Sequence, residues 1–220
     1  MTPLSRIFAP RTLALMAHDL KRLRTYRRYR RTRDLVPALD RLHLGCGPRR
    51  VTGWLNVDLE KSDFDVDIVR RLPWRDGSFQ AIVGQHVIEH LELEGEGLAL
   101  LGELARVLTR DGELWLSCPD MEKICRAYLS GHMDMMLRDR QSRFPDYRPG
   151  TPVVHMVNDL FHQAGEHKNL FDYPLLEWAL VTAGIRHVRR VKEKDLLARF
   201  PDFPERGDDL MTVYVVATKG

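Results

Sequence analysis

The chain has 220 residues, of which 44% are hydrophobic and 30% charged, with a formal net charge of +3. This length suits one α/β domain with a substantial core and is too short for two large domains. The three cysteines are an odd set without metal-ligand spacing, which argues against a disulfide framework and favours a reducing cytoplasm. No apolar run approaches the roughly 18 residues that span a bilayer, and the patch at 13–17 is too short for a signal peptide.

The N-terminal segment is strongly basic, because residues 21–33 carry eight Lys and Arg side chains and no acid. We expect residues 1–38 to form a basic amphipathic helix ahead of a domain at 39–220. The apolar positions that repeat at intervals of three and four are Leu13, Met16, Leu20, Leu23 and Tyr26. Three roles are open: a cap on the sheet or a ligand cleft, peripheral contact of residues 11–33 with an anionic membrane, and, ranked last, binding of nucleic acid phosphates.

A glycine turn follows the first predicted strand. Residues 41–44 read as a short apolar strand that runs into Gly45-Cys46-Gly47, and residues 55–57 form a second strand that ends at Asp58. In an open parallel sheet, ligands bind beyond the carboxyl ends of the strands. Glycines there allow close backbone approach, and an acid at the next strand tip can accept hydrogen bonds from ribose hydroxyls. The pair predicts a site for a nucleoside-containing cofactor.

The spacing of the turn narrows the kind of cofactor. A dinucleotide fingerprint needs a third glycine, a helix directly behind the turn and an acid about 20 residues further on. Here Pro48 follows the second glycine, and Asp58 lies 11 positions after Gly47. The chain also lacks a phosphate-binding G-x-x-x-x-G-K-[ST] loop. The site therefore suits a ribose and a base, and the link from Gly47 to Trp54 leaves room for at most one helical turn.

Short apolar strands then alternate with helical segments, which is typical of a doubly wound parallel sheet. We expect a strand that ends near Asp67, a strand at 80–84, a helix at 98–108, a loop that ends at 111–112, a fifth strand that stops at Pro119, a helix at 175–183, and strands at 186–191 and 211–217.

The motifs in this order are 41–48, 66–68, 72–79, 81–83, 86–91, 103–108 and 111–120. Together they resemble the class I S-adenosylmethionine-dependent methyltransferases, in particular the type 11 group, over roughly residues 41–220. The nearest match is a bacterial subgroup associated with polysaccharide biosynthesis clusters. The resemblance implies a Rossmann-like doubly wound sheet of seven strands, the last antiparallel, and S-adenosylmethionine as cofactor.

The resemblance also implies roles for individual residues. Asp67 would face the adenine amino group beside the Ile68 backbone, and His86 would border the transferable methyl group at the tip of the fourth strand. The catalytic candidates are His86 and His167, with His167 as the best candidate for a general base or substrate contact. The predicted cofactor-binding residues are Gly45, Cys46, Gly47, Asp58, Leu59, Asp67, Ile68 and Gln85. The chain departs from the wider superfamily at His43, at Gln80 and in the missing third glycine.

Residues 121–170 are expected to form an insertion that shapes the acceptor pocket. Met133, Met135 and Met136 are interpreted as adaptable packing. His155, His162 and His167 follow at spacings of seven and five, which do not share a helical face as a zinc pair would. No metal site is predicted. His90 is interpreted as a packing and hydrogen-bonding residue.

We therefore expect a cytoplasmic methyltransferase, with membrane association left open, that O-methylates a saccharide or saccharide precursor. The protein would mainly align the nucleophile for an in-line displacement, and a base would add about 10²–10⁴-fold. Two alternatives are methylation of a lipid or quinone at a membrane surface and a non-catalytic cofactor-binding partner protein. A nicotinamide-dependent sugar enzyme is disfavoured because the chain has no Tyr-x-x-x-Lys pair. No oligomeric state is predicted.

Overall fold

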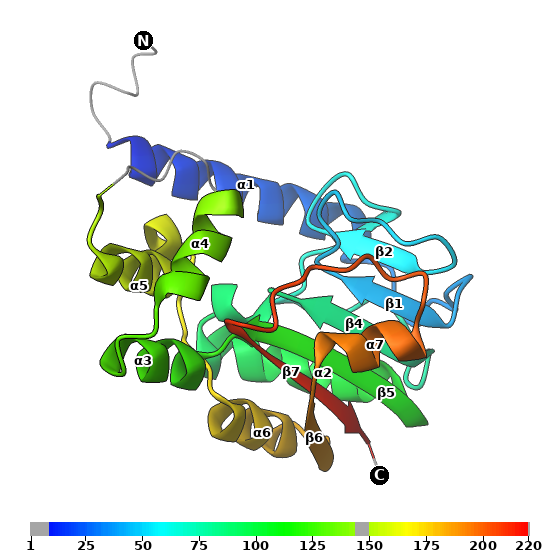
Figure 1. Cartoon of the computed structure of the whole chain (residues 1–220). Coiled ribbons are helices and arrows are strands. Elements are labelled where there is room, and N and C mark those ends of the chain that lie inside the picture. Colours follow the sequence, from blue (N-terminus) through cyan, green and yellow to red (C-terminus); the bar gives the residue numbers. More distant parts are fainter. Residues whose placement is uncertain (1–8, 144–149, 220) are drawn as a thin grey trace.

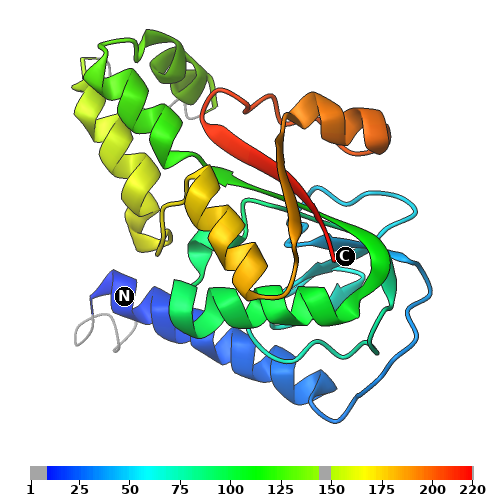
Figure 2. The same cartoon turned by 90° about the horizontal axis from the view of Figure 1, so that it is seen from below.

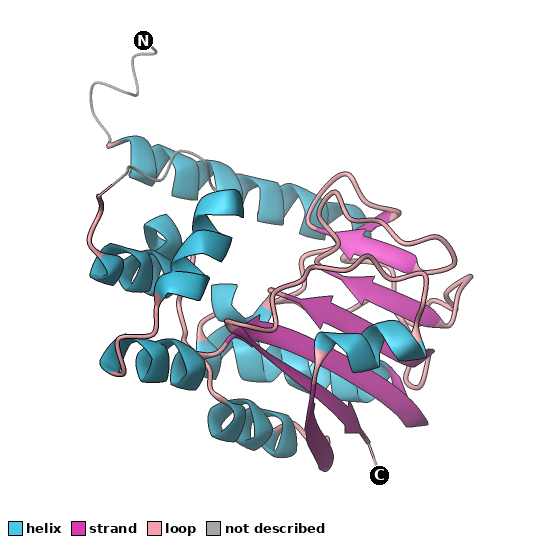
Figure 3. Cartoon of the chain, in the orientation of Figure 1, coloured by secondary structure: helices cyan, strands magenta, loops and turns pink. Residues whose placement is uncertain are grey.

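The computed structural model describes residues 9–143 and 150–219 of the chain (Figure 1). Its centre is a seven-stranded sheet in the order β3-β2-β1-β4-β5-β7-β6, in which β7 runs antiparallel to both β5 and β6 (Figure 3). This arrangement confirms the predicted Rossmann-like sheet. The strands are β1 (Arg41–Leu44), β2 (Leu55–Asp58), β3 (Phe64–Asp65), β4 (Phe79–Gln85), β5 (Leu108–Pro119), β6 (His187–Val191) and β7 (Thr212–Thr218).

Helices cover both faces of the sheet (Figure 2). α2 and α6 pack on one face, α7 lies on the other, and α3, α4 and α5 lie beyond the carboxyl ends of the parallel strands (Figure 1). The helices are α1 (Pro10–Tyr29), α2 (Leu98–Val107), α3 (Met121–Leu129), α4 (Asp134–Arg143), α5 (Val153–His162), α6 (Tyr173–Thr182) and α7 (Glu193–Arg199), with short turns η2 (Ile88–His90), η3 (Leu93–Gly97) and η4 (Gln163–Gly165).

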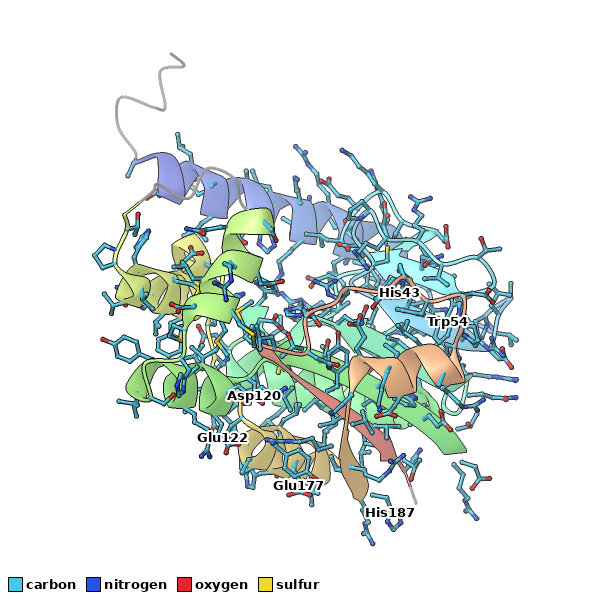
Figure 4. The ribbon with its side chains drawn as sticks, in the orientation of Figure 1. His43, Trp54, Asp120, Glu122, Glu177 and His187 are labelled. Carbon is cyan, nitrogen blue, oxygen red and sulfur yellow. The ribbon has the colours of Figure 1, made fainter. Side chains whose placement is uncertain are left out.

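The strands alternate their side chains between two cores, as the twofold periodicity of a strand requires. Along β4, Ile82 packs on the α2 and α6 face, whereas Val83 packs on the α7 face. The α7 face is held by edge-to-face contacts of Trp54 with Phe200 and Phe203, whose ring centroids lie 4.9 and 5.1 Å away. Figure 4 shows Trp54 beside α7.

The predicted elements recur with shifted ends. Residues 45–54 contain no helix, as the short link predicts, and β3 ends two residues before Asp67. The loop expected to end at residue 112 is wrong, because β5 begins at Leu108, directly after α2. Leu108 is fully buried and pairs with Phe79, so the chain gains a buried contact by entering the sheet early. The pairing of β4 with β5 is irregular between Phe79 and Ala81, which accommodates the early entry.

The three helices α3, α4 and α5 enclose a core of their own. Met133 and Met136 are buried there with Ile124 and Met156, whereas Met135 is exposed. α3 begins at Asp120, whose carboxylate accepts hydrogen bonds from the backbone N–H groups of the first turn (Figure 4). Such a cap satisfies donors that the helix itself leaves unpaired. The predicted acceptor-pocket insertion thus contains a packed helical unit at the carboxyl edge of the sheet.

Helix α1 crosses the same edge of the sheet, above β2 (Figure 1). The Thr25 hydroxyl donates to the Leu59 carbonyl and the Tyr29 hydroxyl to the Asp67 carbonyl, both at 2.9 Å. The basic helix predicted over residues 1–38 covers Pro10–Tyr29, and residues 1–8 lie outside the described residues. Most of its apolar repeat faces solvent, since Met16, Leu20 and Leu23 are 49%, 52% and 43% exposed, whereas Tyr26 packs against the core. Within the described part of the chain, none of the helices has the length and apolar character needed to cross a bilayer.

Candidate active site

A cleft of about 590 Å³ lies at the carboxyl ends of β1, β2 and β4, beneath α1. In an open parallel sheet this is the edge at which ligands bind. We call one part of the cleft the glycine end (Gly45, Asp58, Leu59, Asp67, Ile68) and the other the histidine end (His86, His90, Glu166, Lys168). Six predicted site residues line this cleft, namely Gly45, Asp58, Leu59, Asp67, Ile68 and His86.

The glycine turn and Asp58 form one hydrogen-bonded unit. The Gly47 N–H donates to Asp58 Oδ2 at 2.8 Å, and the Leu59 N–H donates to Oδ1 at 2.6 Å. Gly45 has φ +63°, and a Cβ there would lie 2.4 Å from Val87 Cγ2, so no other residue fits without a shift. The carboxylate is therefore held in place at the cleft wall, with lone pairs left to accept from hydroxyl groups.

Three predicted cofactor-binding residues do not line the cleft. Cys46 is 2% exposed, and burial raises the pKa of its thiol to about 11. Gly47 turns its N–H toward Asp58. Gln85 is buried, and its side-chain amide lies 3.5 Å from the Tyr214 hydroxyl. Cys46 and Gln85 are therefore buried, whereas Gly47 is exposed and holds the Asp58 carboxylate through its N–H.

Asp67 has a partner that sequence reasoning missed. The guanidinium of Arg22 on α1 lies 3.3 Å from Asp67 Oδ2 and 3.1 Å from Glu96 Oε1, so it bridges two carboxylates from different loops. Asp67 is only 3% exposed, and Arg22 lines the cleft. The basic run at 21–33 gave no indication which of its eight cations turns inward.

His86 sits between two carboxylates at the tip of β4. Its Nδ1 lies 3.0 Å from Glu89 Oε1 and its Nε2 lies 2.9 Å from Asp208 Oδ2. Burial by itself lowers the pKa of His86, but the hydrogen bonds to Asp208 and Glu89 outweigh it and raise the pKa above its ordinary value. Both ring nitrogens then donate, so His86 is an imidazolium rather than a free base.

Asp208 is a second functional neighbour that the sequence did not reveal. It is 6% exposed and accepts from the Tyr214 hydroxyl at 2.5 Å as well as from Arg206 Nε at 3.0 Å. Burial raises the pKa of Asp208, yet the hydrogen bonds and charges of His86, Tyr214 and Arg206 hold it well below its usual range. The carboxylate therefore stays charged and fixes the His86 ring at the cleft wall.

His90 and His167 lie side by side with their ring centroids 5.0 Å apart. His90 lines the cleft, whereas His167 is 9% exposed and lies behind it. Burial lowers the pKa of His167, which favours the neutral ring. The other two histidines of the predicted series, His155 and His162, are exposed on α5. Of the two catalytic candidates, His86 thus faces the cleft directly and His167 contacts it only through His90.

Residues 57–116, which include the strand tip at Asp58 and the His86–His90 segment, match the type 11 methyltransferase family, whose model is described as a methyltransferase domain. The match spans residues 57–116 only, and it supports the predicted S-adenosylmethionine-dependent methyltransferase activity and cofactor. No curated protein matches the sequence significantly.

Solved structures resemble this chain at low identity. The CMeT domain of the citrinin polyketide synthase is 13% identical with a TM-score of 0.48; the match covers 85% of this chain, which spans 48% of that one. A methyltransferase from Thermotoga maritima is 15% identical with a TM-score of 0.48, covering 91% of this chain and 88% of that one. One from Archaeoglobus fulgidus is 16% identical with a TM-score of 0.45, covering 91% and 94%.

The residues of the glycine end fit S-adenosylmethionine. Gly45 has no side chain, so its backbone can approach a ligand directly. A Cβ at this position would occupy the space against Val87. Asp58 presents a fixed carboxylate for ribose hydroxyls, and Leu59 and Ile68 supply apolar surface for a base.

Proposed function

We propose that this methyltransferase transfers a methyl group to a hydroxyl of a saccharide or saccharide precursor in the cytoplasm. The observation that carries the proposal is the polarity of the histidine end, where His86, His90, Glu166 and Lys168 line the cleft. Hydroxyl-rich acceptors need several such donors and acceptors for orientation. The glycine end is walled instead by apolar Leu59 and Ile68, which suit a nucleobase.

The chain's own residues then have distinct tasks. S-adenosylmethionine supplies an activated methyl group when bound. His86, fixed by Glu89 and Asp208, presents a positive charge and orients polar atoms of the acceptor. Among the histidines that line the cleft, His90 has its Nδ1 3.2 Å from the Glu166 carbonyl, so its Nε2 is the nitrogen available to receive the hydroxyl proton. Alignment of the acceptor hydroxyl with the methyl group provides most of the rate acceleration. Removal of the hydroxyl proton provides a further part.

A second candidate is a lipid or quinone acceptor at a membrane surface. It is favoured by the outer face of α1, where Met16, Leu20 and Leu23 are exposed beside the exposed arginines Arg24 and Arg27. A helix with apolar and cationic side chains on one face can lie on an anionic bilayer. The acceptor would then enter the cleft beneath α1 from the membrane.

The first test is calorimetric titration of S-adenosylmethionine and S-adenosylhomocysteine into the full chain and the Asp58→Ala variant. We expect micromolar binding to the full chain and at least a tenfold loss in the variant, because the ribose contact is removed. Asp202→Ala, at an exposed position in the turn after α7, is the matched control and should bind normally. Absence of binding to the unaltered chain would refute the proposal.

An acceptor screen separates the candidates. Transfer of a radiolabelled methyl group to nucleotide sugars or soluble saccharides supports the saccharide proposal. Transfer only to lipid-linked saccharides or quinones, and only with anionic vesicles, supports the membrane candidate. Tight cofactor binding without transfer to either class would identify a non-catalytic cofactor-binding protein.

A further inference from the structure

Three potential metal ligands converge behind the histidine end. Glu89 and His90 belong to η2, and His167 follows η4 much later in the chain. One ligand atom from each lies within 4.8 Å of the others. The segments are pinned together by backbone hydrogen bonds, because the N–H groups of Lys168 and Asn169 donate to the Glu89 carbonyl at 2.8 and 3.2 Å. We call Glu89, His90 and His167 the His-Glu cluster.

Both imidazoles of the His-Glu cluster are oriented as metal ligands commonly are. His90 Nδ1 lies 3.2 Å from the Glu166 carbonyl, and His167 Nδ1 lies 2.7 Å from the Leu160 carbonyl. A carbonyl only accepts, so Nδ1 carries the proton in each ring and Nε2 offers a bare lone pair. A backbone carbonyl on the far nitrogen is a common outer contact of metal-bound histidine, which fixes its tautomer.

The Glu89 carboxylate supplies an independent observation. Glu89 is 1% exposed, and its Oε1 contacts the His86 imidazole at 3.0 Å. Its other oxygen, Oε2, is buried and has no hydrogen-bond partner among the described residues. A buried carboxylate oxygen without a donor is costly, so such atoms are usually paired or coordinate a cation.

We propose that the His-Glu cluster binds a divalent transition metal ion such as Zn²⁺. Two imidazoles and one carboxylate are the donor set of open, catalytic zinc sites. Atoms within 4.8 Å of one another can surround an ion after shifts of less than about 1 Å each, to reach bonds of roughly 2.0–2.2 Å. His90 lines the cleft, so the fourth position of the ion opens toward the acceptor.

The ion would change how the acceptor hydroxyl is activated, a consequence that rests on the proposed function. A hydroxyl oxygen bound at the open position would lose its proton to solvent more readily because the metal stabilises the oxyanion, and the oxyanion would then take the methyl group from the sulfonium, leaving S-adenosylhomocysteine. His90 would then be a ligand rather than the proton acceptor. The two roles differ in what they require: a base at His90 needs neither Glu89 nor His167, whereas a metal site needs all three.

Metal binding itself is the decisive measurement. The full chain, stripped with chelator, is titrated with Co²⁺ and followed by its visible d–d absorption, then competed with Zn²⁺. We expect one ion per chain, and binding weakened at least about 100-fold in Glu89→Gln and His167→Gln, because each loses one of three ligands. His162→Gln, an exposed histidine on α5, is the control and should bind as the unaltered chain does.

Thermal melts and S-adenosylmethionine titration of each variant establish that it is folded. A folded chain that takes up no Co²⁺, or folded Glu89→Gln and His167→Gln variants that bind it unchanged, would overturn the metal site. Stoichiometric metal binding with no methyl transfer to any hydroxyl would leave the site standing and refute the proposed function instead. Full transfer activity in metal-free His167→Gln would assign His90 as a base and exclude a metal role.

Discussion

The glycine end and the histidine end of the cleft differ in how far apart their residues lie in the chain. Gly47 and Asp58 are hydrogen-bonded across 11 positions, between neighbouring strands. At the histidine end, His86 and Asp208 meet across 122 positions, and His90 meets His167 from a segment beyond α5. Site residues that belong to one turn and the next strand tip lie at a recognisable spacing in the sequence. Site residues that the tertiary fold brings together from distant segments have no such spacing.

The largest expected effect is at the turn itself. Gly45→Ala combines a positive φ, which costs about 1–2 kcal/mol for an L side chain, with a Cβ only 2.4 Å from Val87 Cγ2, a clash that costs about 1–3 kcal/mol. The turn must move to relieve the overlap. We expect S-adenosylmethionine affinity to fall about 100-fold in calorimetric titration.

Gly47→Ala is the matched control, because Gly47 has φ +51° but open space where a Cβ would be. This variant carries the backbone strain alone and should lose about tenfold or less. Equal affinities for the two variants would show that the close approach of Gly45 to Val87 is not what shapes the cofactor cradle.

The next effect tests whether the glycine end depends on α1. Arg22→Ala leaves Asp67, which is 3% exposed, and Glu96 without their shared cation. Removing one partner of a largely buried ion pair should lower the free energy of unfolding by about 2–3 kcal/mol. Urea denaturation measures it. Arg24→Ala, on the exposed side of the same helix, should change it by less than about 0.5 kcal/mol, and an equal loss in both would contradict the bridging role.

Much of the fold could be predicted because its determinants are local. The apolar strands, the glycine turn and the acid at 58 are short-range patterns, and strand topology follows from their order. The structure differs where a tertiary contact decides the local conformation. β5 starts early because Leu108 is buried against Phe79, and the apolar repeat of α1 turns outward because Thr25 and Tyr29 hydrogen-bond the loops inside.

The histidine end could be predicted only in part, for the same reason. The position of His86 at a strand tip predicts that it lies at the site. Its charge is set by two carboxylate partners, Glu89 and Asp208, which its position in the sequence does not predict. Helical spacing relates only residues of one helix, such as His155 and His162 on α5, and gives no partner for His167. His167 instead meets Glu89 and His90, and no spacing rule joins these segments.

A smaller effect concerns the outer face of α1. Each Arg near an anionic bilayer contributes about 1 kcal/mol, so Arg27→Gln should weaken binding to anionic vesicles about fivefold. Arg110→Gln, exposed on β5 away from α1, should leave binding unchanged, and cosedimentation with vesicles of increasing anionic lipid content measures both. If neither the unaltered chain nor the variants cosediment, the apolar stripe on α1 does not serve a membrane.

The smallest expected effect is at His43, the residue that stands where the wider superfamily has an acid. His43 is buried behind the glycine turn, 3.1 Å from the Asn56 side-chain oxygen, with its ring against Phe203 (Figure 4). Burial lowers the pKa of His43, with Arg49 and Arg206 adding to it and the Asn56 hydrogen bond and Asp58 opposing it. The ring therefore stays neutral in the fold while the unfolded chain titrates near 6.5.

As the pH falls, His43 is protonated in the unfolded chain before it is protonated in the folded chain. His43 should therefore lower the free energy of unfolding below a pH of about 6.5 and have no effect on it above that pH. His43→Gln retains a donor for Asn56 and removes the titration, so its melting temperature should fall less steeply between neutral and acidic pH. His187→Gln, at an exposed position on β6, should follow the unaltered chain (Figure 4). Parallel pH profiles for all three proteins would mean that His43 titrates alike in the folded and unfolded chains, so that burial does not hold its ring neutral.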